Sequence, residues 1–334
     1  MKKMSCSIII GLLICLLGMP GCGDKVVEKK PIKIAINVWP GYAHVFLAQE
    51  KGLFKKNNVD VELVLKKSTP ESLEMFTNGD ADACFDVFAN LISLNSKGIR
   101  AKVVYITDYS ISGDVIIGRP EINSVSELGG KAVAIEGFNT FSHIFVLGSL
   151  IKAGVKEAQV KFENIPAHDV LKALEEKRID AGHTWEPEKS QALKKGYKIL
   201  AQAGDNPGII TDVLFFSNKA IKERSEEIQA IVKSLFEAQD ELTKNKDESL
   251  KIMASKMEMT VEEMASGLEG AKITGLQENR EMMAKTTSST PNKPSLFSTG
   301  PMIIDFYLKR GQLSKILEIE EFVEPKFLKD LDNK

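Results

Sequence analysis

The hydrophobic pattern of the chain alternates between two periods. Lys33–Val38 and Val59–Leu65 alternate apolar and polar positions and are rich in β-branched residues, which predicts two strands. Each strand is followed by a segment with helical spacing, the first ending at Gly52 and the second running from Pro70 to the Asn78-Gly79 stop. Strands that alternate with helices predict an α/β fold with mostly parallel sheets.

The same order of elements returns later in the chain. A strand is predicted at 131–135, followed by a helix that ends at Gly154 and, later, by a second Asp-Ala pair. The interval from Lys33 to Lys131 equals the interval from Asp82 to Asp180. This agreement favours two lobes of similar topology, although a shared α/β rhythm would also produce it.

The N-terminus has the pattern of an export signal. Two lysines precede the apolar run at 7–19, which is short for a membrane span and typical of a signal-peptide core. The run ends in a segment that resembles a lipobox, with small Gly21 before Cys22, although Met19-Pro20 departs from its usual residues. We therefore expect a lipoprotein signal peptide at 1–21 and lipidation of Cys22, with ordinary signal cleavage as the alternative.

Composition places the rest of the chain among exported globular proteins. The 334 residues are 43% hydrophobic and 27% charged, and the net charge of −2 gives no reason to expect a nucleic-acid partner. Residues 22–31 are charged and short of large apolar groups, as in a tether. With Cys22 lipidated, Cys84 has no partner for an intrachain disulfide. No metal-ligand spacing or phosphate loop is present, so no cofactor, metal or catalytic site is expected.

Ligands of open α/β sheets bind at the carboxyl ends of strands. In this chain those positions are Trp39–Tyr42 and Phe85–Phe88 in the first lobe, and Gly137–Ser142 and Thr184–Glu186 in the second. Two lobes facing each other would line a cleft with these four loops.

Several segments, in this order, resemble a known family. They are 33–63, "GDADACFD" at 79–86, "TDYSISGDVIIGR" at 107–119, 124–143, and "RIDAGHTWEP" at 178–187. Together they resemble the periplasmic solute-binding proteins of ABC importers for nitrate, sulfonates, taurine and thiamine-pyrimidine precursors.

The resemblance implies a bilobal clamp of two mostly parallel α/β lobes joined by two crossovers. We expect the crossovers near Tyr109–Val115 and Asp212–Ser217. The first lobe would then comprise 32–112 and the C-terminal helices of 215–334, and the second lobe 113–214. The implied partners are a small solute and an ABC permease with its ATPase, and the receptor itself would be a monomer held to the membrane by its lipid alone.

Candidate site residues follow from these loops. Trp39, Tyr42 and Trp185 offer rings for stacking, and the tight Pro-Gly turn makes burial of the first two difficult, although rings can also cap a core. The small and polar residues of 137–142 open a helix that could bind an anion, with ordinary capping as the alternative. Asp86 could bind an amine or cap a helix, and Asp212 could hold a crossover. The predicted ligand-binding residues are Trp39, Tyr42, Asp86, Phe138, Asn139, Thr140, Ser142, Trp185, Glu186 and Asp212.

These residues indicate a small polar solute that is either taurine-like or an amino-bearing heteroaromatic. Nitrate fits less well because no arginine or lysine stands in the proposed loops. One alternative is a sensory lipoprotein that signals to a kinase without transport. Another is an enzyme like the thiamine-pyrimidine synthase of the same fold, but its mark is a cysteine-rich segment, and here "ADACFDVF" contains only Cys84.

Overall fold

The computed structural model describes residues 30–285 and 294–331. The predicted signal peptide (1–21), Cys22 and all but the end of the tether lie outside the described residues, as does part of the polar segment after Ala284. Residues 31–334 form one compact unit. Among the described residues, none of the helices combines the length and apolar character that a membrane span requires.

The first sheet has six strands in the order β11-β4-β10-β3-β1-β2. Its central strand β3 is buried at every position, which is why its sequence is apolar on both faces apart from Asp86. The bounds are β1 (Ile32–Asn37), β2 (Val61–Lys66), β3 (Ala83–Val87), β4 (Ala101–Ser110), β10 (Thr211–Ser217) and β11 (Ala271–Ile273).

The second sheet has five strands in the order β7-β6-β8-β5-β9. A separate cluster of buried apolar side chains, including Val115, Val170 and Leu174, packs on this sheet. The bounds are β5 (Val115–Gly118), β6 (Ala132–Ile135), β7 (Lys161–Asn164), β8 (Ala181–Thr184) and β9 (Lys198–Gln202).

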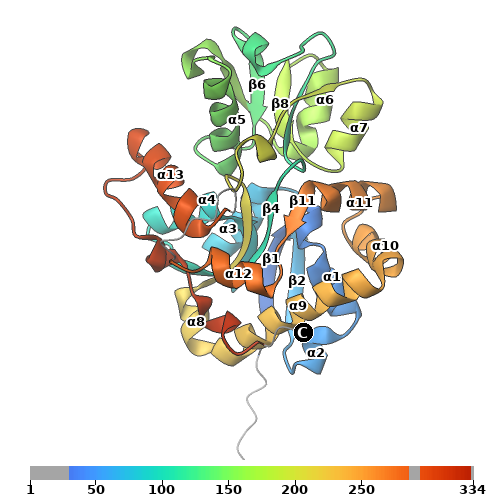
Figure 1. Cartoon of the computed structure of the whole chain (residues 1–334), viewed down its shortest axis with the longest axis vertical. Coiled ribbons are helices and arrows are strands. Elements are labelled where there is room, and N and C mark those ends of the chain that lie inside the picture. Colours follow the sequence, from blue (N-terminus) through green and yellow to red (C-terminus); the bar gives the residue numbers. More distant parts are fainter. Residues whose placement is uncertain (1–29, 286–293, 332–334) are drawn as a thin grey trace, which may run out of the picture. The chain divides into compact units, whose positions relative to one another are not determined.

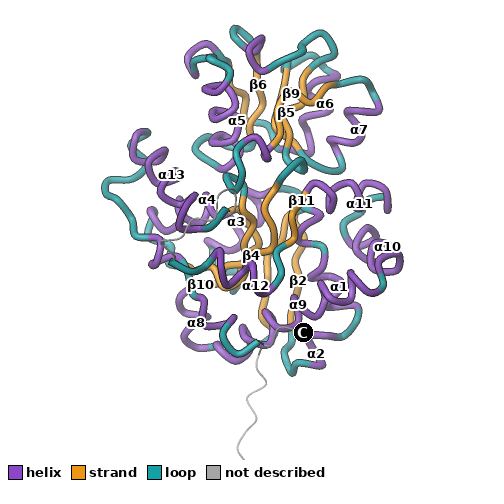
Figure 2. The backbone as a smooth tube through the Cα atoms, in the orientation of Figure 1, coloured by secondary structure: helices purple, strands orange, loops and turns teal. Residues whose placement is uncertain are grey.

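Helices surround both sheets. Figure 1 shows α5, α6 and α7 around β6 and β8, and Figure 2 shows the strands at the centre of each lobe with helices outside them. The bounds are α1 (His44–Glu50), α2 (Leu53–Lys56), α3 (Thr69–Thr77), α4 (Phe88–Ser96), α5 (Phe141–Lys152), α6 (Val170–Glu175), α7 (Glu188–Lys194), α8 (Asn218–Glu223), α9 (Ser225–Lys244), α10 (Lys246–Lys256), α11 (Val261–Gly270), α12 (Leu276–Met282) and α13 (Leu296–Lys309).

The expectation of a two-lobed α/β fold is confirmed, but both sheets are mixed. The parallel pairs are β1–β2, β1–β3, β6–β7 and β6–β8. The crossover strands β4, β5, β9 and β10 pair antiparallel with their neighbours. The strands that arrive from the other sheet, β5 and β10, run against the strands of the local βαβ units, whereas β4 and β9, which leave for it, run with them. Most strands of each sheet therefore run in one direction, as predicted, and the antiparallel strands are an addition that the sequence pattern did not indicate.

The repeated order of elements corresponds to a repeated structural unit. Asp82 precedes β3, and its carboxylate accepts the Lys33 backbone N–H of β1 at 3.0 Å. Asp180 precedes β8, and its carboxylate accepts the Ala132 backbone N–H of β6 at 2.9 Å. The two Asp-Ala pairs therefore have the same structural role in the two lobes.

Two crossovers connect the sheets, at 111–114 and at 203–210. The prediction placed the second at Asp212–Ser217, but these residues belong to β10 of the first sheet, so the chain returns to the first lobe earlier than expected. At the first crossover, the backbone N–H groups of Ile111, Ser112 and Gly113 all donate to the Gly270 carbonyl at 2.9–3.1 Å. A Cβ on Gly270 would lie 2.6 Å from the Gly113 nitrogen, so only glycine permits this approach.

Candidate ligand-binding site

A pocket lies between the ends of the strands of the two sheets. It contains about 250 Å³ of atom-free space, open solvent included. Its walls come from β1, β3 and β10 of the first lobe and from the crossover, α5 and β8 regions of the second. The lining residues are Asn37, Trp39, Tyr42, Thr69, Asp86, Val87, Asp114, Phe141, Trp185, Ile210 and Asp212.

Trp39 and Tyr42 line the pocket and are also buried, with exposed fractions of 4% and 1%. This corrects the expectation that the Pro-Gly turn would keep them exposed. Trp39 Nε1 donates to both carboxylate oxygens of Asp108 at 3.2 and 3.3 Å, and the Tyr42 hydroxyl donates to Asp212. The short 3₁₀ turn at Pro40–Tyr42 therefore directs both rings toward the acidic ends of β4 and β10.

The second lobe contributes aromatic rings to the same pocket. Trp185 follows β8 and is 6% exposed. Its Nε1 donates to the Val38 carbonyl of the first lobe at 2.8 Å, and its ring centroid lies 6.0 Å from that of Phe141. The pocket consequently has aromatic walls on both sides, which favours a flat or apolar ligand body.

Several buried oxygens in the pocket lack hydrogen-bond donors. Asp86 Oδ1 accepts the Val87 N–H at 2.5 Å and the Asn90 amide at 2.7 Å. Within the described residues, Asp86 Oδ2, Asp212 Oδ2 and Asn37 Oδ1 have no hydrogen-bonding partner. With the carboxylates ionised, all three atoms are acceptors, and a buried acceptor without a donor is costly. The pocket is therefore complementary to a ligand that donates hydrogen bonds.

The acidic groups have pKa values that reflect this environment. Burial raises the pKa of Asp86 and of Asp212 well above the usual range, and for Asp212 the neighbouring Asp108 raises it further. Burial also raises the pKa of Asp108 and of Glu136 to about 7. A positive charge in the pocket would stabilise the ionised carboxylates and reverse these shifts.

The charged side chains that line the pocket are all acidic. Of the described residues that line the pocket, three are aspartates and none is lysine, arginine or histidine. The predicted anion site at the start of α5 is also occupied from within the protein, because the Phe141 N–H donates to Asn90 Oδ1 at 3.2 Å. The geometry thus offers acceptors to a solute and few free donors.

Four residues predicted in the loop before α5 do not line the pocket. The loop turns away through left-handed conformations at Gly137 (φ 90°) and Asn139 (φ 58°). Phe138 is 53% exposed, and Asn139 Oδ1 accepts from Arg310 Nε of the C-terminal region at 2.7 Å. The Thr140 hydroxyl donates to the carbonyls of Glu136 and Gly137, as in ordinary capping. Ser142 Oγ, the fourth, lies behind the pocket and contacts His183 at 2.8 Å.

Glu186 is the fifth predicted residue outside the pocket lining. Its Oε1 accepts from Ser190 Oγ at 3.0 Å and from Ser266 Oγ of α11 at 2.8 Å, and lies 3.1 Å from Lys189 Nζ. Because α11 packs on the first lobe, this buried carboxylate links the two lobes. Its sequence position beside Trp185 could not distinguish this role from ligand contact.

Sequence reasoning missed some residues of the lining and undervalued one. Asn37 is the last residue of β1, so the strand-end rule could have found it. Phe141 is apolar, and the prediction for its segment relied on the polar residues beside it. The sequence pattern around Thr69 and Ile210 gave no indication of ligand contact. Asp114 belongs to the segment predicted as the first crossover, where its sequence position left a hinge role and ligand contact equally open, and it lines the pocket.

Two lobes joined by two crossovers, with a pocket between their strand ends, define the periplasmic binding protein fold. Among solved structures, the ligand-binding component of an ABC-type import system from Staphylococcus aureus matches with a TM-score of 0.73 and 18% identity, over 90% of this chain and 99% of that one. The aliphatic sulphonate binding protein SsuA from Escherichia coli matches with a TM-score of 0.69 and 18% identity, over 89% and 98%.

The NMT1/THI5-like family model matches residues 39–249, and the chain belongs to this family. A protein of Brucella abortus (strain 2308), provisionally named a binding protein, is 24% identical over 83% of this chain and 84% of its own. A Brucella suis protein with the same kind of name matches to the same extent. The desulfurization enzyme DSZB shares the fold as well, with a TM-score of 0.66 at 12% identity. The fold alone therefore does not separate binding from catalysis.

Proposed function

We propose that this protein is the solute-binding component of an ABC importer and that its solute is a small, flat or apolar molecule bearing an amine. The amino-heteroaromatic class fits this description better than the taurine or sulfonate class. The observation that carries the proposal is the set of unpartnered acceptors, Asp86 Oδ2, Asp212 Oδ2 and Asn37 Oδ1, between the aromatic rings of the pocket.

An amine supplies what these acceptors lack. An amino group or ammonium donates two or three hydrogen bonds, and a positive charge compensates buried carboxylates. The rings of Trp39, Tyr42 and Trp185 would hold the body of the solute, and a cation gains further from the faces of such rings. A sulfonate or nitrate would instead place negative charge beside Asp86, Asp114 and Asp212 with no lining cation to offset it.

Closure of the lobes around the solute explains how binding is signalled to a permease. Trp185 Nε1 bonds to Val38 O, and Ser266 Oγ bonds to Glu186, so contacts between the lobes surround the pocket. A solute that contacts both lobes shifts the population toward this arrangement. In the proposal, a permease with its ATPase recognises the closed form and accepts the solute.

The proposal includes export and anchoring. The signal-like segment 1–21 and the lipobox-like Cys22 support a lipoprotein held at the outer face of a membrane, with 22–31 as tether. The receptor would act as a monomer. Mass spectrometry of the membrane-extracted protein tests the anchor, because diacylated Cys22 at the N-terminus supports it and an unmodified, freely soluble product contradicts it.

A thermal-shift panel tests the solute class. The probes are 4-aminopyrimidine and benzylamine as aromatic amines, and taurine, ethanesulfonate and nitrate as anionic or zwitterionic solutes. A ligand at 100 times its Kd adds about 2.7 kcal/mol to stability, enough for a shift of about 4 °C in a chain of this size. Shifts from the amines that disappear in Trp185→Ala support the proposal. A shift from the sulfonate or nitrate alone would overturn the amine assignment.

A further inference from the structure

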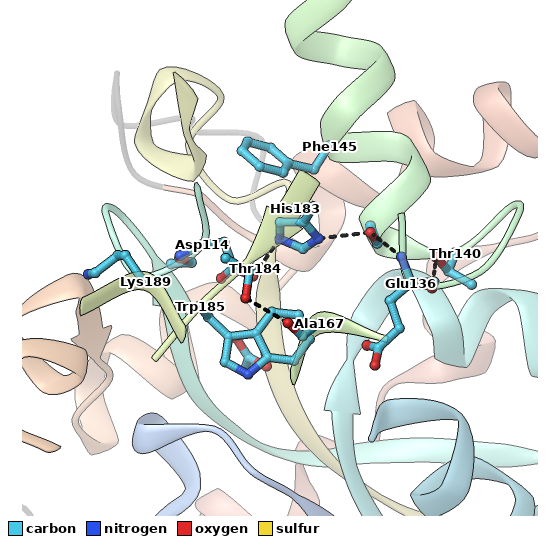
Figure 3. Close-up of polar contacts among 12 residues, drawn as sticks. Asp114, Glu136, Thr140, Phe145, Ala167, His183, Thr184, Trp185 and Lys189 are labelled. Atoms are coloured by element: carbon cyan, nitrogen blue, oxygen red, sulfur yellow. Dashed lines mark hydrogen bonds and ion pairs between the residues drawn. The ribbon is translucent and has the colours of Figure 1, made fainter. Parts of the chain in front are cut away.

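A buried chain of hydrogen bonds runs from the start of α5 to the pocket. The Glu136 backbone N–H donates to Ser142 Oγ at 2.9 Å, Ser142 Oγ lies 2.8 Å from His183 Nδ1, and His183 Nε2 lies 3.0 Å from Asp114 Oδ1. Ser142 and His183 are fully buried, and Asp114 nearly so. Figure 3 shows His183 with Asp114 on one side of the imidazole.

The contacts of the serine are compatible with an arrangement of protons in which its hydroxyl donates to the imidazole. Ser142 Oγ accepts the Glu136 N–H, so its own hydroxyl proton is available for His183 Nδ1. With Nδ1 accepting, the proton of the neutral ring is on Nε2, which donates to Asp114 Oδ1. In this arrangement the Asp114 carboxylate accepts the hydrogen bond.

Aromatic packing holds the imidazole in this orientation. The ring centroid of His183 lies 5.0 Å from that of Phe145, 5.6 Å from that of Phe141 and 5.5 Å from that of Trp185. A ring enclosed on several sides cannot rotate away from its partners without displacing them. This chain of hydrogen bonds therefore sets the position of the Asp114 carboxylate at its end.

The order of the serine, histidine and aspartate in this hydrogen-bond chain differs from that of a hydrolytic triad. In a Ser-His-Asp triad the serine faces the substrate and the aspartate lies behind the histidine. Here Asp114 lines the pocket, whereas Ser142 is fully buried and does not line it. The arrangement delivers a carboxylate to the ligand rather than a nucleophile.

We propose that His183, oriented by Ser142, is a positioning residue that presents the Asp114 carboxylate as the second lobe's acceptor for the amine of the solute. This inference rests on the proposed function. It assigns the amine a contact in each lobe, with Asp86 or Asp212 on the first and Asp114 on the second, so only an amine-bearing solute would bridge both. His183 would thereby contribute to selectivity without touching the solute.

The first arm of the test needs no ligand. Nitrogen-15 NMR of the purified protein at pH 8 reads the protonated nitrogen of each imidazole, and His183→Gln assigns the signal among the four histidines. The expected result is a protonated Nε2 on His183. A protonated Nδ1 with bare Nε2 would mean that Asp114 carries the proton, which overturns the proposal.

The second arm measures affinity for 4-aminopyrimidine and for pyrimidine, which lacks the amine. His183→Leu should weaken 4-aminopyrimidine binding about tenfold or more, the worth of one hydrogen bond to a charged group, and leave pyrimidine binding nearly unchanged. His183→Gln should retain most of the affinity, because its amide can donate to Asp114 and accept from Ser142. Equal losses for both probes, or no rescue by glutamine, would show a merely structural role.

A matched pair of serine variants completes the design. Ser142→Ala should lower the selectivity for the amine, whereas Ser149→Ala, at a buried serine of the same helix that bonds to the Phe145 carbonyl, should not. Equal effects of the two variants contradict the role of Ser142. If wild-type protein binds neither probe, the proposed solute class fails, and the NMR result alone decides whether His183 orients Asp114.

Discussion

The two lobes contribute to the pocket in different ways. The first lobe supplies Asp86 and Asp212, which stand on the paired strands β3 and β10 and each keep one oxygen without a partner among residues 30–285 and 294–331. The second lobe supplies Asp114, whose carboxylate is held by His183, together with the rings of Phe141 and Trp185. The first lobe therefore offers carboxylate oxygens that are open to a donor from the solute, and the second offers a carboxylate that His183 already orients.

This difference shows what each kind of element can do. A strand end fixes a side chain by its place in the sheet, so the acids of the first lobe are placed without further help. Asp114 lies in a crossover, where the backbone is held mainly by hydrogen bonds to Gly270, and its side chain gains order from the histidine. We expect the following changes to affect the two lobes' contributions differently, from the largest effect to the smallest.

Asp86→Asn should have the largest effect and should separate binding from stability. Removing the charge from a buried ion pair costs about 3–5 kcal/mol, so affinity for an amine solute should fall at least about 100-fold. The free protein should become more stable at pH 8, because it no longer buries an unpaired carboxylate. Titration calorimetry and thermal unfolding measure the two effects. Asp305→Asn, at an exposed position of α13, is the control and should change neither.

The stability of the free protein should rise as pH falls from 8 to 6.5. The raised pKa values of Asp86, Asp108, Asp212 and Glu136 mean that the folded protein binds more protons than the unfolded chain in this range. For each such group, the free energy of unfolding falls by about 1.4 kcal/mol per pH unit as pH rises between the pKa of that group in the unfolded chain and its pKa in the folded protein. Denaturant unfolding at a series of pH values measures the slope.

Two histidines oppose this trend at lower pH. Burial lowers the pKa of His44 and of His143 to about 4, so below about pH 6.5 the unfolded chain binds protons that the folded protein does not. The rise in stability should therefore become less steep below pH 6.5. A protein that loses stability steadily from pH 8 downward would contradict the assignment of the carboxylates.

Asn90→Ala should weaken solute binding by about tenfold, the worth of one or two buried hydrogen bonds. Asn90 connects the lobes, because its amide donates to Asp86 and its carbonyl accepts the Phe141 N–H of α5. Asn95→Ala is the matched control on the same helix, since Asn95 bonds only to Leu91 and Ala101 of the first lobe. Both variants should unfold at lower temperature, but only Asn90→Ala should lose affinity.

Arg310→Gln should have the smallest effect. Arg310 joins the end of α13 to Asn139 and Glu157 of the second lobe, and its side chain is partly exposed. Exposed pairs of this kind contribute about 0–1 kcal/mol, so affinity should fall less than about fivefold. Arg178→Gln removes a pair within the second lobe and should leave affinity unchanged. Equal affinities for the two variants would show that the contact does not favour closure.

Sequence patterns predicted the elements with regular periods better than the loops. The strand-end rule placed Trp39, Asp86 and Trp185 at the pocket because their side chains are carried by regular strands or follow them directly. It failed in the loop before α5, where the positive φ of Asn139 turns residues away from the pocket. Backbone conformation of this kind has no periodic signal.

The contacts between the lobes were also beyond prediction. The bond from Glu186 to Ser266 and the chain from Ser142 to Asp114 join residues that lie far apart in sequence. Nothing in the local pattern of either segment marks its partner. These hydrogen-bond partners can be identified only from the folded structure, in which the two lobes are in contact.

The most direct test of the central claim is titration calorimetry with two solutes that share a ring and differ in the sign of the attached charge, benzylamine and phenylmethanesulfonate. Runs at pH 6.5 in buffers of different ionisation enthalpy also report protons exchanged on binding. The account predicts that benzylamine binds more tightly and releases protons, because its charge favours the ionised carboxylates. Tighter binding of the sulfonate, with uptake of protons, would contradict it.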